Sequence, residues 1–454
     1  MNIILIVVDA LRPDHLSING YNRNTSPNID KFAKEGTIFL NAYASLPNSD
    51  PSVTSILTGM YPHSHGVRML FNNKLKPSIS TLPGILKSHG YKTAYMKCGS
   101  TYKFGLESGF DEYDLLGWKI KNKIKRGVYK ILHQQNYLDV TQQYTDLAIK
   151  WIKKNASKNF FLFIHYINLH WPYKSPKPFD HMFDADYKGK HLFNTLVEEN
   201  KISRGEMIFG LKKLPKEEVE HAIAHYDGGL KYIDFNIGKL LNFLKDKDLD
   251  DKTLIVITSD HGESFGEHEY YFQHGSHLYE DGIKVPIIFN NPAIIPKGKK
   301  IKDMVQNLDI MPTALNLLNI PLIDNLDGVN MLPLIEGKKD KARDFVFAES
   351  VENYWKENKR MFFEGVEGKW RAMIFNDWKI ILIPNPKDNI YELYNLKDDP
   401  QEKNNLIDKE KEIASKMKKR LLEFLKEQSI EGEANLSDLT ERSKKLLKDL
   451  GYIG

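Results

Sequence analysis

The chain has 454 residues, which is long for a single hydrophobic core, so we expect one large domain and a smaller one. Its net charge of +4, from 64 basic and 60 acidic residues, gives no reason to expect nucleic acid as a partner. The single cysteine, Cys98, excludes an internal disulfide framework and fits a reducing compartment. No uncharged stretch is long enough to span a bilayer, and the N-terminal apolar run is too short for a signal peptide. We therefore expect a cytoplasmic protein without a membrane anchor.

Strand and helix patterns alternate over the first three-quarters of the chain, as βαβ units require. Apolar runs predict buried strands at residues 3–8, 93–96, 160–164, 253–259 and 285–289. Helices are predicted between Pro27 and Gly36 and at residues 82–89, 217–244 and 310–318. Residues 1–335 are therefore predicted to form an α/β domain, a large mixed and mostly parallel sheet sandwiched by helices.

The pattern changes after about residue 335. Residues 370–375 and 378–383 flank Asn376-Asp377, which predicts a β-hairpin. A Lys/Glu-rich amphipathic helix is predicted at about 409–428, followed by a charged tail. We expect residues 336–454 to form a small α+β subdomain with an antiparallel sheet. A basic run at 119–130 is usually a solvated face, and attraction of an anionic substrate is the other interpretation.

Two apolar strands far apart in the sequence both run into an aspartate. The first ends at Asp9, and the second ends at Asp260, which His261 follows at once. In open α/β sheets, ligands bind beyond the carboxyl ends of the strands. Two carboxylates and one imidazole at that edge predict a site for a divalent metal ion.

The segment from Ser49 to Gly59 is the second informative stretch. Asp50 suits a helix N-cap, Pro51 the first helical position and Gly59 the C-terminal stop. The free N–H groups of such a helix would face Ser49 and could bind a tetrahedral anion such as sulfate or phosphate. The serine oxygen, bound to a divalent ion, could attack phosphorus or sulfur. An ordinary capped helix is the alternative.

The same segment resembles the sulfatase family of the alkaline-phosphatase superfamily. That family carries Cys or Ser, any residue, Pro, Ser and Arg, then Leu-x-Thr-Gly. The residues in register with this pattern are Ser49, Pro51, Ser52, Leu57, Thr58 and Gly59. Other stretches similar to the family, in its order, are residues 8–14, 25–30, 169–173, 258–263, 274–280, 283–286, 309–313, 326–328 and 391–406. The resemblance therefore spans almost the whole chain.

The resemblance implies that Asp9, Asp260, His261 and the oxygen of Ser49 hold one divalent metal ion. Many members of the family have a second aspartate where this chain has Ala10, and calcium-binding members have Asn in place of His261. Exchange of a carboxylate for an imidazole favours Mn²⁺ or Zn²⁺ over Ca²⁺ or Mg²⁺.

The resemblance also raises the question of formylglycine, into which family sulfatases convert the Cys or Ser. The converting enzymes recognise a motif with Arg at the position of Val53. We therefore predict that Ser49 stays a serine and attacks directly. A serine sulfate lacks the hemiacetal route for expelling sulfate, so this prediction favours phosphate or phosphonate esters.

Four further residues are candidates for the same site. By resemblance, His170 contacts the transferring group, while His274 lies beside the position of a sulfate-binding lysine. His274 or the neighbouring His277 could protonate the leaving oxygen. The Lys-Trp-His stretch of the family is not intact here, and Lys97 is the candidate anion contact in that region.

The sequence thus predicts a metal-dependent hydrolase of sulfate, phosphate or phosphonate esters that forms a covalent intermediate on Ser49. Its substrate would be an anionic small-molecule or glycan ester. The first alternative is a transferase that moves a phosphoglycerol or phosphoethanolamine headgroup onto an acceptor glycan. The second is a binding protein that kept the fold and lost the chemistry.

Overall fold

The structure is a computed structural model that describes residues 1–68, 74–97, 105–113, 140–187, 213–351, 369–384 and 388–428. Cys98, the basic run at 119–130 and the charged tail after residue 428 lie outside these residues. Among the described residues, no helix is both long enough and apolar enough to cross a membrane.

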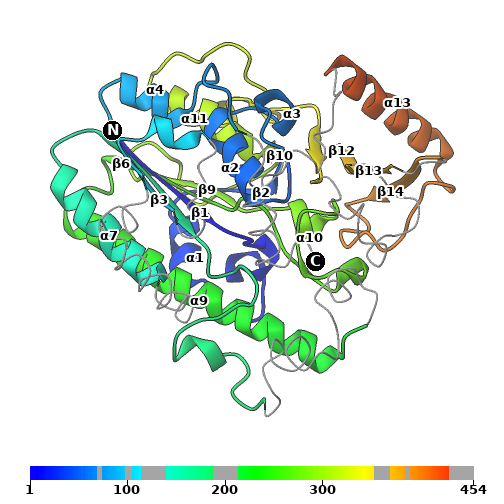
Figure 1. The fold of residues 1–454 in the computed structure, drawn as a ribbon, viewed down its shortest axis with the longest axis horizontal. Helices are drawn as coiled ribbons and strands as arrows, with labels where there is room; N and C mark the ends of the chain where they lie inside the picture. The colour runs from blue at the N-terminus through cyan, green and yellow to red at the C-terminus, as the bar shows by residue number, and fades with distance from the viewer. Residues whose placement is uncertain are drawn as a thin grey trace.

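An eight-stranded sheet forms the centre of the molecule (Figure 1). In spatial order its strands are β10 (Lys299–Gln306), β2 (Thr37–Tyr43), β9 (Ile287–Asn290), β6 (Thr253–Thr258), β1 (Asn2–Val8), β5 (Phe160–Tyr166), β3 (Lys92–Lys97) and β4 (Glu112–Tyr113). Strand β9 is antiparallel to both of its neighbours, and the other pairs are parallel. The predicted large, mostly parallel sheet is confirmed.

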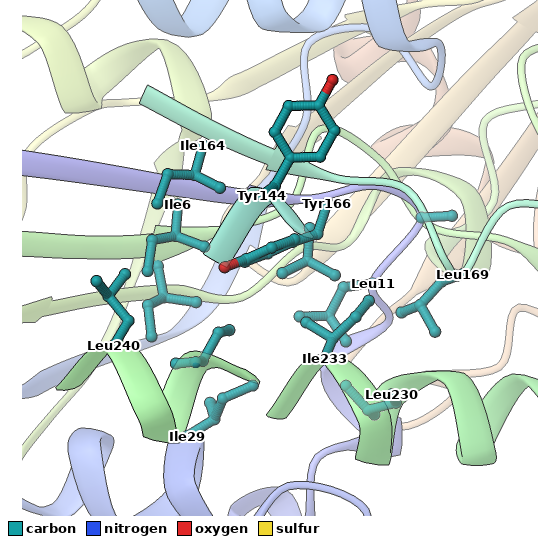
Figure 2. Packing of buried hydrophobic residues seen from close by; sticks show 14 of the residues in the cluster. Ile6, Leu11, Ile29, Tyr144, Ile164, Tyr166, Leu169, Leu230, Ile233 and Leu240 are labelled. Carbon is teal, nitrogen blue, oxygen red and sulfur yellow. The ribbon is translucent and has the colours of Figure 1, made fainter. Parts of the chain in front are cut away.

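Helices cover both faces of this sheet, because its central strands are apolar on both sides. The side chains of β1 alternate: Ile4 and Ile6 belong to one buried cluster, and Ile3 and Leu5 to the other. The first cluster packs against α1 (Pro27–Lys34), α7 (Val140–Asn155) and α9 (Lys216–Asp246), as Figure 2 shows for part of it. The second packs against α2 (Ser49–Thr58), α4 (Leu82–Ser88), α11 (Ile310–Leu317) and α12 (Leu332–Ile335).

A smaller antiparallel sheet follows the large domain. Its strands are β11 (Val346–Glu349), β12 (Arg371–Phe375), β13 (Trp378–Ile383) and β14 (Ile390–Asn395), in that order. One face packs on the large domain, where Trp370 and Ile381 meet Tyr279 and Ile283. The other face is covered by α13 (Lys411–Glu427), which buries Met417 and Leu421. The predicted small sheet with its helix is confirmed, and the division at residue 335 stays a prediction.

Two of the element boundaries that differ from the predicted ones concern the candidate site. Strand β5 continues two residues past Ile164, so that His165 belongs to the strand. Helix α2 begins at Ser49 with Asn48 as its N-cap residue, whereas the sequence placed the cap at Asp50. Pro51 is tolerated because the first turn of a helix does not use the N–H that proline lacks.

Candidate active site

The candidate site lies where three neighbouring strands end. Val7 of β1 is paired with His165 of β5 on one side and with Thr258 of β6 on the other. Because the three strands are parallel, the residues that follow these positions emerge at the same edge of the sheet. Asp9 comes directly after β1, and Asp260 comes two residues after β6.

The turn after β1 is fixed by hydrogen bonds to the segment after β6. Ala10 has a φ of 56°, a left-handed conformation that costs energy for a residue with a Cβ atom. The Ser259 hydroxyl donates to the Val8 carbonyl over 2.7 Å and accepts from the Leu11 amide over 2.9 Å. The Ala10 amide donates to Asp260 Oδ1 over 3.2 Å. Residue 10 thus contributes a backbone donor that orients a carboxylate.

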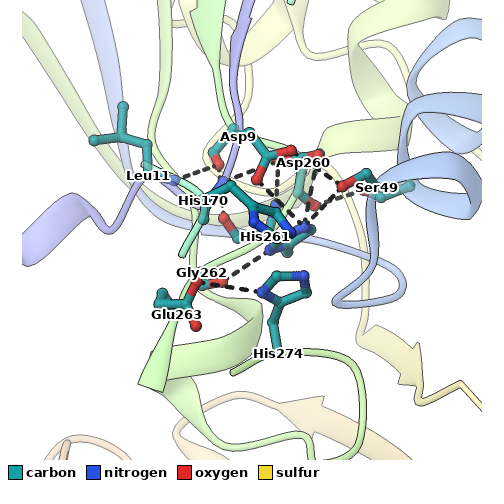
Figure 3. A network of polar contacts seen from close by, with 12 residues as sticks. Asp9, Leu11, Ser49, His170, Asp260, His261, Gly262, Glu263 and His274 are labelled. Carbon is teal, nitrogen blue, oxygen red and sulfur yellow. Dashed lines mark hydrogen bonds and ion pairs between the residues drawn. The ribbon is translucent and has the colours of Figure 1, made fainter. Parts of the chain in front are cut away.

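Two histidines face the two carboxylates. His165 Nε2 lies 3.6 Å from Asp9 Oδ2 and 3.4 Å from Asp260 Oδ2. His261 Nε2 lies 4.0 Å from Asp9 Oδ1 and 3.6 Å from Asp260 Oδ2. All four side chains are buried. Figure 3 shows Asp9, Asp260 and His261 converging on one point beside Ser49.

These atoms fit a divalent cation. The Nδ1–H of His261 donates to the Gly262 carbonyl over 2.8 Å, which leaves Nε2 with a lone pair directed at the carboxylates. Asp9 Oδ1 and Asp260 Oδ2 are buried and accept no hydrogen bond from the described residues. Separations of 3.2 to 4.0 Å are close to those between ligand atoms that each bind one ion at about 2.1 Å. The two imidazoles and two carboxylates are therefore candidate ligands for one divalent ion.

Sequence reasoning did not identify His165. Asp9, His165 and Asp260 form a group whose ligand atoms all lie within 4.8 Å of one another. The available signal was a histidine at the end of a strand that is otherwise apolar, next to the strand of Asp9. Because the predicted strand stopped at Ile164, this position was not considered. His165 supplies a potential ligand where Ala10 supplies none.

Ser49 is the first residue of α2 and is half-buried, so its hydroxyl can be reached by a substrate. Its Oγ lies 3.2 Å from Asp9 Oδ2 and 3.2 Å from His261 Nε2. The helix is fastened to the end of β6 by Ser52, whose hydroxyl donates to the Asp260 carbonyl over 2.6 Å and accepts from Asn307 over 2.8 Å. Ser52 therefore fixes the position of Ser49 relative to Asp260.

His274 and His170 border this cluster. The His274 ring stacks on the His261 ring with centroids 4.0 Å apart, and the His170 ring meets it edge-on at 5.4 Å. Glu263 Oε2 lies 3.3 Å from His274 Nδ1 and holds that ring in place, as Figure 3 shows. His170 Nδ1 donates to the Trp171 carbonyl over 2.8 Å. Both histidines thus border the metal-ligand cluster, and their catalytic roles stay predictions.

The two remaining candidates are not brought into this cluster. His277 is fully buried, and its Nε2 lies 2.6 Å from the Ser264 hydroxyl. Burial lowers the pKa of His277 well below its ordinary value, which makes it a poor proton donor. Of the two histidines proposed to protonate the leaving group, the geometry favours His274. Lys97 ends β3, and its side chain lies outside what the structure describes.

The charges of the site are unbalanced without a cation. Burial and the neighbouring charge of Asp260 raise the pKa of Asp9 to about 7. Burial would raise the pKa of Asp260 as well, but His261 and His165 outweigh it and hold that pKa below its ordinary value. Burial lowers the pKa of His261 below its ordinary value, against the opposing effect of Asp260. A divalent cation would relieve the repulsion between the two carboxylates.

Comparison of the sequence with known proteins identifies its family. The Sulfatase family model matches residues 1–320, and a model described as N-sulphoglucosamine sulphohydrolase, C-terminal, matches residues 266–428. The chain belongs to the sulfatase family. As a sulfatase of the alkaline-phosphatase-like superfamily it is a sulfuric ester hydrolase, so the prediction of a hydrolase is confirmed.

Two curated relatives of this sulfatase cover most of its length. An arylsulfatase of Clostridium perfringens is 28% identical over 397 residues, which are 77% of this chain and 81% of that protein. An N-acetylglucosamine-6-O-sulfatase of Bacteroides thetaiotaomicron is 26% identical over 499 residues, covering 94% of this chain and 86% of the relative.

Solved structures share the fold of this sulfatase. A phosphonate monoester hydrolase of Agrobacterium radiobacter has a TM-score of 0.75 at 20% identity, covering 97% of this chain and 98% of the other. A structure in complex with its substrate D-glucosamine-2-N,6-O-disulfate has a TM-score of 0.72 at 22% identity, covering 97% and 99%.

Proposed function

We propose that this sulfatase is a metal-dependent ester hydrolase that attacks with an unmodified Ser49 and turns over phosphodiesters or phosphonate monoesters faster than sulfate esters. The observation that carries the proposal is the environment of Val53, one turn after Ser49 on α2. Val53 is 2% exposed and packs in the apolar cluster beneath the sheet. The position at which the formylglycine motif requires an arginine is therefore part of the hydrophobic core.

In the first half-reaction, Ser49 Oγ attacks the sulfur or phosphorus atom of the ester. The serine hydroxyl loses its proton to water, the bond from Oγ to the central atom forms, the bond to the alcohol oxygen breaks, and the departing oxygen takes a proton from His274. A divalent ion held by Asp9, His165, Asp260 and His261 would lower the pKa of the serine hydroxyl and offset the negative charge of the ester. The N-terminus of α2 adds N–H groups on the side of the anion.

In the second half-reaction, water must cleave the ester on Ser49. A formylglycine hydrate can expel sulfate by using its second hydroxyl, whereas a serine ester has no such group. Water therefore attacks the central atom, the bond from that atom to Ser49 Oγ breaks, and we assign the proton of the water to His170 or His274. A phosphorus atom accepts such an attack, and this step decides the preference that we propose.

The organic part of the substrate is proposed to be a sugar or another small alcohol. Support comes from the 26% identical N-acetylglucosamine-6-O-sulfatase, which covers 94% of this chain. Residues 114–139 and 188–212 lie outside the described residues. Assays should therefore begin with aryl esters, whose leaving groups need little recognition.

The test compares Mn²⁺-loaded protein on an aryl sulfate, an aryl phosphodiester and an aryl phosphonate, with Ser49→Ala as the control. We expect faster cleavage of the phosphorus esters and a loss of about 10⁶-fold in kcat for Ser49→Ala, the scale seen when a serine nucleophile is removed. Mass spectrometry of the peptide that contains residue 49 should show serine, and acid quenching during turnover should trap its phosphoryl ester.

Two outcomes would overturn the proposal. Faster sulfate cleavage together with loss of two hydrogens at residue 49 would show that Ser49 is converted despite Val53. Retained activity in both Ser49→Ala and Asp260→Ala would show that the cluster is not the catalytic centre. His268→Gln is a matched control, because its Nε2 contacts the Gln401 carbonyl outside the cluster.

A further inference from the structure

A second group of metal-ligating side chains lies on α9. The segment that follows β5 returns over the N-terminal half of this helix, where Gly228 touches the Phe179 carbonyl so closely that a Cβ atom would lie 2.1 Å from it. This contact brings His181 and Asp184 of the segment against His221 and His225 of the helix. We call these four residues the α9 histidine cluster.

The ligand atoms of the cluster converge. One ligand atom each from His181, Asp184 and His225 lie within 4.8 Å of one another. His181 Nδ1 lies 3.7 Å from Asp184 Oδ1, and the Nδ1–H of His221 donates to Asp184 Oδ2. The ring centroid of His225 lies 4.6 Å from the ring centroid of His221 and 5.5 Å from that of His181.

The sequence spacing also suits metal binding. His221 and His225 are four residues apart on α9 and lie on the same face of the helix, an arrangement that places two imidazoles on one ion. His181 and Asp184 are three residues apart on the opposing segment. A carboxylate held by a histidine N–H is a frequent arrangement around zinc ligands.

A purely structural network is the simpler interpretation, since Asp180 Oδ2 also lies 3.8 Å from His181 Nε2. The ligand atoms of His181, Asp184 and His225 nevertheless converge from two separate segments, as the ligands of one metal ion do. His225 is only 4% exposed, so an ion bound there would be partly shielded from water. A divalent cation takes lone pairs from neutral imidazoles and satisfies the carboxylate at the same time.

We propose that the α9 histidine cluster binds a Zn²⁺ ion, separate from the active-site metal, through His181, Asp184 and His225. His221 orients Asp184 by its hydrogen bond. Three protein ligands, of which two are imidazoles and one is a carboxylate, are typical of zinc, with a fourth position left for water.

The site would clamp the segment after β5 onto the helix that supports the catalytic loops. In the same stretch of α9, the Tyr226 hydroxyl donates to the Ala10 carbonyl over 2.7 Å, and Asp227 Oδ1 lies 2.7 Å from His15 Nδ1. The clamped segment also contains His170, four residues after the end of β5. Zinc at the cluster would therefore fix the position of a residue beside the active site without contacting the substrate.

The test uses the untagged full chain carrying Asp9→Ala and Asp260→Ala, so that the active-site cluster cannot bind metal and failure of the proposed function has no bearing on the result. We expect this protein, after removal of metal, to bind one equivalent of Zn²⁺ in equilibrium dialysis. Addition of His181→Gln should raise the Kd at least about 100-fold. His181 has a side chain that is 58% exposed, so its substitution should leave the fold intact.

Co²⁺ provides a second readout. Bound to the double variant, it should give a visible absorption band that His225→Gln and His181→Gln each abolish. His89→Gln is the matched control, because His89 is exposed on the surface after α4 and should leave both the Kd and the band unchanged. Absence of a bound Zn²⁺ ion in the double variant, or a Kd that His181→Gln does not change, would overturn the proposal.

Discussion

Replacement of Asp9 by asparagine should have opposite effects on stability with and without metal. In the metal-free protein, Asp9 and Asp260 lie in one buried cluster, and the pKa of Asp9 is raised from its ordinary value of 3.8 to about 7. At pH 8 the ionised carboxylate therefore opposes folding by about 4 kcal/mol. Asparagine removes this charge and keeps an acceptor for the Ser49 hydroxyl. We expect Asp9→Asn to stabilise the metal-free protein by about 3 kcal/mol at this pH.

The pH dependence of this difference follows from linkage. The unfolded carboxylate ionises near pH 4, whereas the folded one keeps its proton until about pH 7. Stability contributed by the protonated Asp9 is fully present below pH 4 and is lost as the pH rises to 7. The stability advantage of Asp9→Asn should therefore grow between pH 4 and 7 and stay constant above that range.

Thermal unfolding with and without Mn²⁺ provides the assay. Saturating Mn²⁺ should raise the Tm of the wild type, since an ion that binds only the folded state stabilises it, and should raise that of Asp9→Asn far less. Asp234→Asn is the matched control. This buried aspartate accepts the amides of Asn28 and Ile29 outside the metal cluster, so its substitution should change the Tm equally with and without Mn²⁺. If Asp9→Asn lowers the Tm of the metal-free protein, the two carboxylates do not form a cation site.

Three further predictions concern the metal cluster and its supports. His165→Ala should raise the Kd for Mn²⁺ at least about 100-fold in titrations, whereas His170→Ala should change the Kd only a few-fold. An unchanged Kd for His165→Ala would show that His165 is not a metal ligand. Gly262→Ala should destabilise the protein by about 2 to 3 kcal/mol in urea unfolding, because the new Cβ atom would lie 1.9 Å from the Asp281 carbonyl oxygen. An unfolding midpoint equal to that of the wild type would show that this carbonyl moves freely. Arg343→Met should cost about 3 to 5 kcal/mol by leaving the buried carboxylate of Asp309 unpaired, and Asp309→Leu in the same chain should restore part of that loss.

Local patterns in the sequence were sufficient for the elements and for part of the site. The apolar runs of β1 and β6 end at residues that the structure brings together, because parallel strands deliver their carboxyl ends to one edge of the sheet. Asp9, Asp260 and His261 were therefore predictable as a cluster, and the resemblance to the sulfatases added Ser49. The hairpin and the helix after residue 370 were equally visible, since both depend on short-range periodicity.

Contacts between distant segments decided the rest. His165 is one histidine in an apolar strand, and only the pairing of β5 with β1 shows that its ring faces Asp9. His274 and His277 are indistinguishable by spacing, yet one stacks on His261 while the other pairs with Ser264. The α9 histidine cluster is divided between two segments about forty residues apart in the sequence, and the return of the chain over the helix creates it. Sequence periodicity fixes which face of an element is buried, but the partner of each polar side chain depends on how the elements pack.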